Sequence, residues 1–158
     1  MNKINILLTG ANGNLSNKKE MIEKAIKIAE EYVFPKLKID WDIDVLVTNR
    51  LYDLLIPEDG VGGYTRAADF IEFAVNQEKA TENLISEMLV HELCHAARWG
   101  KNNEWMTSLF DRIINEGIAT YFEAEFIKNR NERTVFIQTI LERPDEENEK
   151  ILDQVVIG

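Results

Sequence analysis

Residues 81–99 have the sequence TENLISEMLVHELCHAARW. Its apolar side chains recur with the 3.6-residue period of a helix, at Leu84, Ile85, Met88, Leu89 and Ala96. Thr81 is a good N-cap residue, and Gly100 can end the helix. The sequence therefore predicts one long helix that contains the segment HELCH, residues 91–95.

The HELCH segment combines residue types that bind and use a metal ion. On a helix, His91 and His95 are separated by only about 40° around the axis, so both imidazoles can reach one ion. Glu92 lies about 100° from His91, where it can act on a metal-bound water without being a ligand. Two histidines on one helix face can be a coincidence, but these are the only two in the chain. The motif predicts one zinc ion per chain, with His91 and His95 as ligands and Glu92 as general base.

Catalytic zinc usually has three protein ligands, so a third one must lie elsewhere in the chain. Lys101 stands where the HExxHxxGxxH pattern would place its third histidine, which excludes that pattern. The nearby downstream carboxylates are Glu104, Asp111, Glu116 and Glu123. Glu116 is preferred because it lies in a predicted helix, residues 104–128, that is long enough to pack antiparallel to the motif helix. The following Gly117 would let the two helices approach closely, and Asp111 is the second choice.

The remaining patterns predict a small sheet and one further helix. Strands are expected at residues 4–9, 43–48 and 69–75, with a glycine-rich loop at 59–63. A helix capped by Asn17 should continue until Pro35 blocks it. Together these elements predict an α+β fold, in which a sheet of about three or four strands packs on the N-terminal helix, the motif helix and the helix of Glu116. The 158 residues fit one domain, 1–158.

The composition argues against several other classes of protein. Acidic residues outnumber basic ones by 28 to 18, and the net charge of −10 repels phosphate backbones, so no nucleic acid is expected as a partner. No apolar run is long enough for a membrane span or a signal peptide. The single cysteine, Cys94, excludes an internal disulfide and is expected to pack as a small buried residue. We therefore expect a cytoplasmic protein that binds no membrane.

Three segments of the chain resemble a known group of enzymes. These segments are GVGGYT at residues 60–65, HELCHAARW at 91–99 and NEGIATYFE at 115–123. They are similar to a compact family of predicted zinc-dependent proteases within the gluzincin metallopeptidases. The resemblance covers about residues 60–126 and implies a minimal zincin-like fold.

The resemblance also implies roles for individual residues. His91, His95 and Glu116 would be the zinc ligands. Glu92 would be the catalytic base, and the strand near residues 70–75 would be the sheet edge that lines the cleft.

Some features of related enzymes are missing from this chain. Thermolysin-like members have an aspartate four residues after the glutamate ligand, where it orients a histidine, and this chain has Thr120 there. They also use a further histidine to stabilise the oxyanion, and this chain has no histidine besides His91 and His95. HELCHAARW resembles the motif helix of Spartan-type proteases too, which act on protein crosslinked to DNA. The HG segment that supplies their third histidine is missing, and the net charge of −10 argues against a DNA substrate.

The predicted reaction is hydrolysis of a peptide bond in a peptide or protein substrate. A zinc ion with three protein ligands lowers the pKa of its bound water to about 7. Glu92 would take the proton of that water and pass it to the departing amide nitrogen. The candidates for a second group that stabilises the oxyanion are Tyr64, Arg66, Arg98 and Tyr121. Tyr64 is preferred because its loop could overhang the cleft, whereas Tyr121 is expected to pack in the core.

Two other functions are compatible with parts of the sequence. A zinc-binding protein without hydrolytic activity would keep the same three ligands. It would not need Glu92, however, and a structural site normally has a fourth protein ligand. Residues 9–16, TGANGNLS, follow a predicted strand as a dinucleotide-binding turn does. Ser16 occupies the third glycine position of that motif, and turn formation is a sufficient explanation for the stretch.

Overall fold

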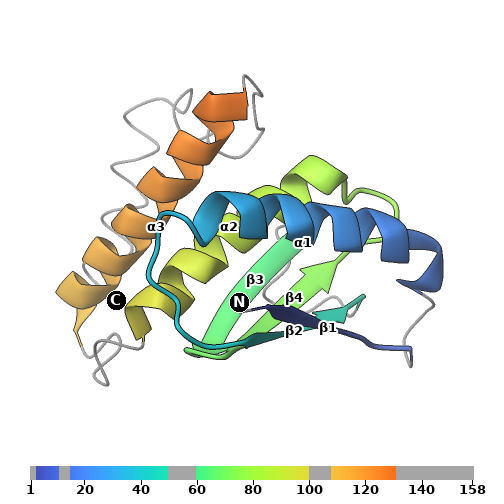
Figure 1. Ribbon diagram of the computed structural model, residues 1–158, viewed down its shortest axis with the longest axis horizontal. Coiled ribbons are helices and arrows are strands. Elements are labelled where there is room, and N and C mark those ends of the chain that lie inside the picture. The colour runs from blue at the N-terminus through green and yellow to red at the C-terminus, as the bar shows by residue number, and fades with distance from the viewer. Residues whose placement is uncertain (1–2, 11–14, 50–59, 100–107, 131–158) are drawn as a thin grey trace.

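The computed structural model in Figure 1 describes residues 3–10, 15–49, 60–99 and 108–130. In chain order, the elements are β1 (Ile4–Leu8), the short 3-10 turn η1 (Leu15–Lys18), α1 (Lys19–Val33), β2 (Ile43–Thr48), β3 (Val61–Ala67), β4 (Phe70–Val75), α2 (Glu82–Trp99) and α3 (Leu109–Arg130). The described elements therefore include three α-helices and a four-stranded sheet, which confirms the predicted α+β class. The centre of the dinucleotide-like turn, residues 11–14, lies outside the described residues.

The four strands form one mixed sheet with the order β1-β2-β4-β3. β2 pairs in parallel with both β1 and β4, whereas β3 pairs antiparallel with β4. A two-residue turn, Ala68 and Asp69, joins β3 to β4 as a hairpin. β3 is consequently an edge strand, with β4 as its neighbour in the sheet.

Two predictions about the region of strand β3 are wrong. The sequence predicts a glycine-rich loop at residues 59–63, but Val61, Gly62 and Gly63 belong to β3. Glycine disfavours strands, and pairing with β4 overrides this local preference because it satisfies the backbone hydrogen-bonding groups. The resemblance places the sheet edge at residues 70–75, but these residues form the interior strand β4, and its neighbour β3 is the edge strand on that side of the sheet.

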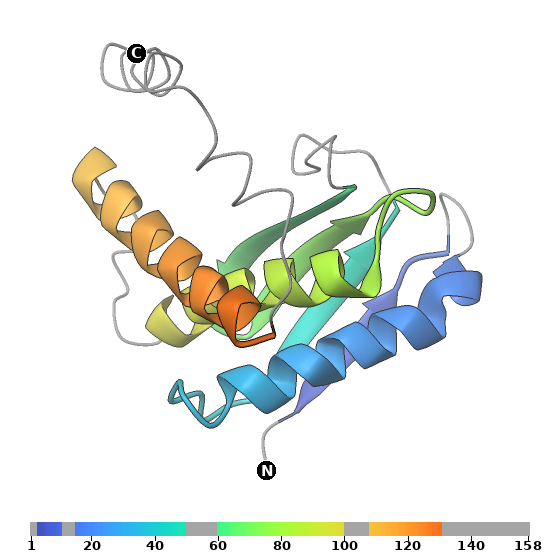
Figure 2. The same cartoon turned by 90° about the horizontal axis from the view of Figure 1, so that it is seen from above.

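Helices α1 and α2 lie side by side on one face of the sheet, and α3 packs against α2 (Figure 2). The core between them is apolar, and its largest fully buried side chains include Ile22, Ile43, Ile71, Phe73, Ile85, Leu89 and Leu93. Full burial of one such side chain contributes about 1.5–3 kcal/mol to stability. This packing makes α2 the central helix, held between α1, α3 and strand β3.

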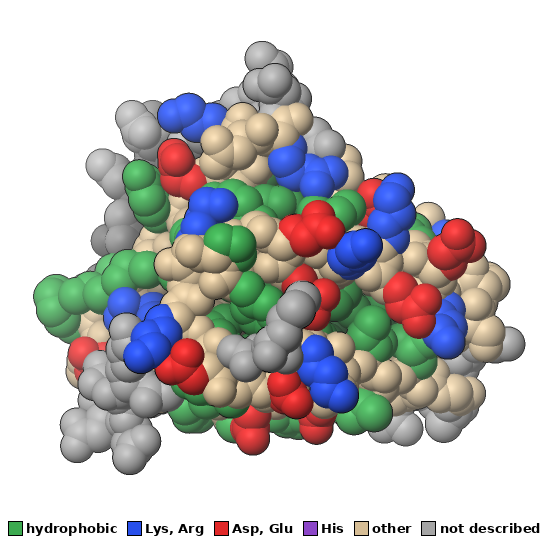
Figure 3. Space-filling view, in the orientation of Figure 1, with side chains coloured by type: hydrophobic (Ala, Val, Ile, Leu, Met, Phe, Trp, Pro, Cys, Tyr) green, Lys and Arg blue, Asp and Glu red, His purple; other side chains and the backbone are tan. Residues whose placement is uncertain are grey.

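Helix α1 begins after the η1 turn and not at a side-chain cap. Asn17 lies within η1, and the residue that precedes α1 makes no side-chain cap hydrogen bond, so the predicted Asn17 cap is wrong. The helix ends at Val33, shortly before Pro35, as predicted. Acidic and basic side chains are interspersed on the face shown in Figure 3, and two pairs on α1 are Lys19–Glu23 and Lys27–Glu31.

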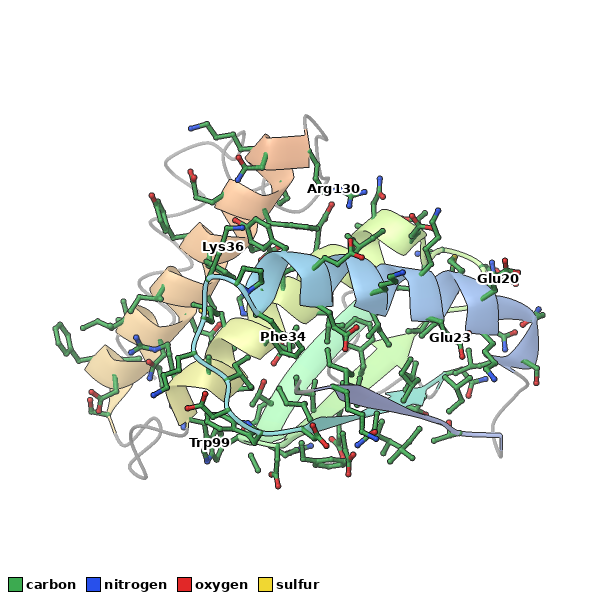
Figure 4. All side chains as sticks on the ribbon, in the orientation of Figure 1. Glu20, Glu23, Phe34, Lys36, Trp99 and Arg130 are labelled. Carbon is green, nitrogen blue, oxygen red and sulfur yellow. The ribbon has the colours of Figure 1, made fainter. Side chains whose placement is uncertain are left out.

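The C-terminal end of α1 also contacts α3 through aromatic side chains. The ring centroid of Tyr32 lies 5.3 Å from that of Phe122 and 4.9 Å from that of Phe126. Figure 4 labels Phe34 and Lys36 at this end of α1, and the Lys36 amino group lies 3.6 Å from the centroid of the Tyr32 ring. These contacts support α3 from the side of α1, in addition to its packing on α2.

Helix α2 begins as predicted. The backbone N–H of Leu84 donates a 3.3 Å hydrogen bond to Thr81 Oγ1, so Thr81 caps the helix. Cys94 is buried, as expected for a small packing residue. The predicted stop at Gly100 lies outside the described residues. Neither α2 nor any other helix in the described ranges is both long enough and apolar enough to cross a membrane.

Helix α3 begins with a reciprocal cap between two side chains. The N–H of Asp111 donates to Ser108 Oγ, and the N–H of Ser108 donates to Asp111 Oδ2, both at 3.1 Å. The first residues of the predicted helix, 104–107, lie outside the described part of the chain. Apart from its chain neighbours and the backbone of its own helix, a Cβ atom at Gly117 would meet no atom within 4 Å, so the prediction that this glycine permits close helix packing is wrong.

Candidate metal centre

His91 and His95 lie on one face of α2, as their spacing of four residues predicts. Their Nε2 atoms are 3.0 Å apart, and their ring centroids are 4.8 Å apart. The two side chains are 13% and 4% exposed. Both imidazoles face α3, because their nearest charged partners are carboxylates on that helix.

Helix α3 adds the carboxylate of Glu116 to this pair. Glu116 Oε2 lies 3.3 Å from His91 Nε2 and 3.5 Å from His95 Nε2. The three side chains form a group that could hold a metal ion. Asp111, the second choice from the sequence, takes part in the cap of α3 and is not a member of this group.

The spacing of the three donor atoms suits a zinc ion. Zinc binds histidine nitrogen and carboxylate oxygen at about 2.0–2.2 Å, which places the donor atoms of a tetrahedral site about 3.3–3.6 Å apart. The separations here are 3.0, 3.3 and 3.5 Å. Three protein ligands leave one tetrahedral position for water or substrate, as is typical of catalytic zinc. The Glu116 side chain is 53% exposed, so the cluster lies at the protein surface.

Glu123 supports the cluster, although the sequence reasoning assigned no role to it beyond naming it as a nearby carboxylate. Its Oε2 lies 3.0 Å from His91 Nδ1, and its side chain is 4% exposed. When Nδ1–H donates to this carboxylate, Nε2 is left with a lone pair for a metal. Glu123 follows Glu116 by seven residues, which is about two helical turns, so both carboxylates share one face of α3. This periodicity is the signal in the sequence that identifies Glu123.

The charges of the cluster shift the pKa values of its members. Burial alone would lower the pKa of His91, but hydrogen bonds to Glu116 and Glu123, together with nearby acidic charge, raise it to about 10. Hydrogen bonds to His91 and His95 hold the pKa of Glu116 well below its usual range. A cation in the cluster would therefore replace a proton on His91.

Replacing Glu123 should weaken zinc binding without removing a ligand. We expect Glu123→Ala to lower zinc affinity by about 10- to 100-fold, because His91 loses the partner that fixes its tautomer and ring orientation. Glu123→Gln should lose less zinc affinity than Glu123→Ala, since its amide oxygen still accepts a hydrogen bond from His91 Nδ1. Competition with a chromophoric chelator measures these affinities. Glu125→Ala is the matched control on the same helix, and equal affinities in the Glu123 and Glu125 variants would contradict this role.

Glu92 is not a member of the metal-binding group, and its buried side chain contacts strand β3. Thr65 Oγ1 lies 2.8 Å from Glu92 Oε2 and 2.9 Å from the backbone carbonyl oxygen of Glu92. Burial raises the pKa of Glu92, although nearby His91 and His95 and the hydrogen bonds with Thr65 act in the opposite direction. A buried carboxylate with a raised pKa is suited to proton transfer near neutral pH. No pattern in the sequence identifies Thr65, because its contact with Glu92 depends on the pairing of β3 with the rest of the sheet.

Arg98 and Asn115 join the ends of α2 and α3 next to the cluster. Nε and Nη2 of Arg98 both donate to Asn115 Oδ1, at 3.0 and 2.7 Å. Asn115 directly precedes Glu116, so this contact helps to set the position of Glu116 beside the histidines. Arg98, a candidate for oxyanion stabilisation from the sequence, is thus engaged in helix packing.

The remaining candidates for oxyanion stabilisation do not join the cluster. Tyr64 alternates with Thr65 along β3, so its ring lies on the face of the sheet opposite to α2. The Arg66 guanidinium lies 4.2 Å from the centroid of the Tyr64 ring and forms a 2.7 Å ion pair with Glu72. Tyr121 is 69% exposed, so the prediction that it packs in the core is wrong.

The fold and the cluster together define a small α+β protein in which two packed helices bring two histidines and a glutamate to a candidate metal site. The chain belongs to the family described as "Predicted Zn-dependent protease (DUF2268)", whose model matches residues 17–140. A search of curated proteins found no match, and a search of solved structures found none. The family description and the donor set of the cluster both support zinc.

Proposed function

We propose that this protein is a zinc metallopeptidase of the gluzincin type, which hydrolyses peptide bonds in peptide or protein substrates. The observation that carries the proposal is the spacing of His91 Nε2, His95 Nε2 and Glu116 Oε2, which lie 3.0–3.5 Å from one another. This donor set is the one expected for catalytic zinc, and the family is described as a predicted zinc-dependent protease. The Glu116 side chain is 53% exposed, so this ligand borders solvent.

The residues of the cluster would hold the ion, and neighbouring residues would control the protons. A bound zinc ion would lower the pKa of a water molecule to about 7 and polarise the carbonyl group of the scissile bond. The Nε2 atoms of His91 and His95 and Oε2 of Glu116 are the proposed ligands. Glu123 Oε2 lies 3.0 Å from His91 Nδ1, and when Nδ1–H donates to it, the lone pair of Nε2 would be available to the ion.

Glu92 is the proposed general base. Its carboxylate would take a proton from the attacking water and pass it to the departing amide nitrogen, which is otherwise too basic to leave. Thr65 Oγ1 lies 2.8 Å from Oε2 of this carboxylate. Glu92 also favours hydrolysis over a purely structural zinc site, because a structural site needs no base next to its ligands.

A peptide digest with controlled zinc content tests the proposal. We expect the purified protein to bind one zinc ion per chain and to cleave members of a broad peptide library, with products identified by mass spectrometry. A chelator should abolish cleavage, and added zinc should restore it, because the proposed reaction needs a water molecule at the fourth position of the zinc ion. Bound zinc with no cleavage of any peptide would overturn the proposed activity and favour a zinc-binding protein without hydrolytic function.

A further inference from the structure

Strand β3 contacts Glu92 at two positions, and we infer that Thr65 is a positioning residue that holds the carboxylate of Glu92 for proton transfer. Thr65 acts through Glu92 and is not a ligand of the metal. The inference rests on the proposed function, since positioning a base has an effect only where there is a reaction. The GVGGYT segment, residues 60–65, would then position Glu92 through strand β3.

The Thr65 hydroxyl holds Glu92 at both ends. Oγ1 lies 2.9 Å from the backbone carbonyl oxygen of Glu92 and 2.8 Å from its Oε2. The single proton of this hydroxyl is shared between the carbonyl oxygen and the carboxylate of Glu92, and a rotation about the side-chain bonds of Glu92 would break the contact with Oε2. Thr65 is itself buried, and a β-branched side chain has little freedom at χ1. The carboxylate is thereby held in one defined position.

Gly63 provides the space for this contact. A Cβ atom at position 63 would lie 2.8 Å from Oε1 and 2.9 Å from Cδ of Glu92, and closer still to Cγ. A residue with a side chain would therefore displace Glu92 or move β3 away from α2. Gly63 and Thr65 are two residues apart in a strand, so both lie on the face of β3 that packs on α2. The strand thus confines Glu92 with a backbone surface at one position and a hydroxyl at the next.

A buried carboxylate needs a hydrogen-bond partner whatever its function, so the contact could serve stability alone. A positioning role differs from a purely structural role because its loss changes the rate of proton transfer. Both hydrogen-bond contacts of the Thr65 side chain go to Glu92, and neither goes to a proposed ligand. Loss of the hydroxyl should therefore slow the proton-transfer step and leave zinc binding unchanged.

The main experiment compares Thr65→Val, which removes the hydroxyl, with Thr65→Ser, which keeps it. In the zinc-loaded full chain, we expect Thr65→Val to lower kcat by about 10- to 100-fold, as misplacement of a catalytic group does. KM and zinc affinity should stay within about twofold of wild type, and Thr65→Ser should keep kcat within about threefold of wild type, since its hydroxyl restores the contact. Thr48→Val is the matched control, because Thr48 is also buried in the sheet but lies on β2.

Carbon-13 NMR gives a readout that does not depend on cleavage. The Cδ resonance of Glu92, assigned by its loss in Glu92→Gln, should shift in Thr65→Val and stay in place in Thr48→Val. Gly63→Ala is a second variant, and it should lower kcat and shift the same resonance because its methyl group displaces Glu92. Gly10→Ala is the control for this variant, since a Cβ atom at Gly10 would meet no atom within 4 Å apart from those of its chain neighbours.

The results separate the inference from the proposed function. If Thr65→Val cleaves with the wild-type kcat, or leaves the Glu92 resonance unshifted, the positioning role is wrong even though the protein is a peptidase. If the kcat of Thr65→Ser falls as far as that of Thr65→Val while its zinc content and unfolding temperature are normal, the hydroxyl is not the group that positions Glu92. If wild-type protein cleaves no peptide, the proposed function fails, and Thr65 has no reaction to assist.

Discussion

Replacing Glu92 with glutamine is expected to abolish peptide cleavage while the protein still binds zinc. Glutamine has nearly the same shape, but its amide cannot accept and return the proton that the reaction transfers. General acid–base catalysis by a positioned group is worth about 10²- to 10⁴-fold, and kcat/KM should fall by an amount in this range. Zinc should remain bound because Glu92 is not a member of the group formed by His91, His95 and Glu116.

The measurement for Glu92→Gln is cleavage of the best library peptide at equal zinc occupancy, with occupancy determined by atomic absorption. Glu30→Gln serves as the control, because it also neutralises a carboxylate that accepts a hydrogen bond, but in α1, where Glu30 Oε1 binds the backbone N–H of Ile4. The control should cleave like wild type. Undiminished cleavage by Glu92→Gln would show that another group transfers the proton.

Replacing Glu116 with alanine is expected to have the largest effect on zinc binding. The variant loses one of three donor atoms and leaves the two histidines as the remaining ligands. Loss of a supporting partner costs about 10- to 100-fold in metal affinity, and loss of a ligand should cost more than this. Glu116 is half exposed on α3, and alanine favours helices, so the variant should remain folded. Calorimetric titration with zinc measures the affinity, and circular dichroism checks the fold.

Asp111→Ala is the matched control for Glu116→Ala. Asp111 lies on the same helix and was the alternative ligand from the sequence, but its side chain accepts hydrogen bonds from Ser108 at the start of α3. Its loss should cost a few tenths to about 2 kcal/mol of stability, as for other helix caps, and leave zinc affinity unchanged. Reduced affinity in Asp111→Ala together with wild-type affinity in Glu116→Ala would transfer the ligand role to Asp111.

The features predicted well from the sequence are those that depend on residues close together in the chain. Thr81 caps α2, and the pair His91 and His95 shares a face of that helix, because a helix repeats every 3.6 residues whatever it packs against. The position of Pro35 likewise limits α1 through a local steric effect. The choice of Glu116 needed one further assumption, that a second helix packs on the first, and α3 does so.

Other predictions failed where neighbours in space outweigh local preference. Gly62 and Gly63 have the composition of a loop, yet they lie in β3, because the adjacent β4 offers backbone partners. Tyr121 has the composition of a core residue, but its side chain on α3 is 69% exposed. Gly117 suggests close helix packing, but the space around it is open. In each case the amino acid is compatible with two environments, and the packing partner decides between them.

The sequence by itself determined the α+β class, the motif helix and the residues expected to bind zinc, because these follow from periodicity and from the chemistry of two histidines and a carboxylate. Only the tertiary structure decided that β3 is the sheet edge, that Thr65 contacts Glu92, and that Glu123 contacts His91. These contacts join residues 27 and 32 positions apart in the chain. They form only when separate elements pack together, and no local pattern determines how those elements are oriented.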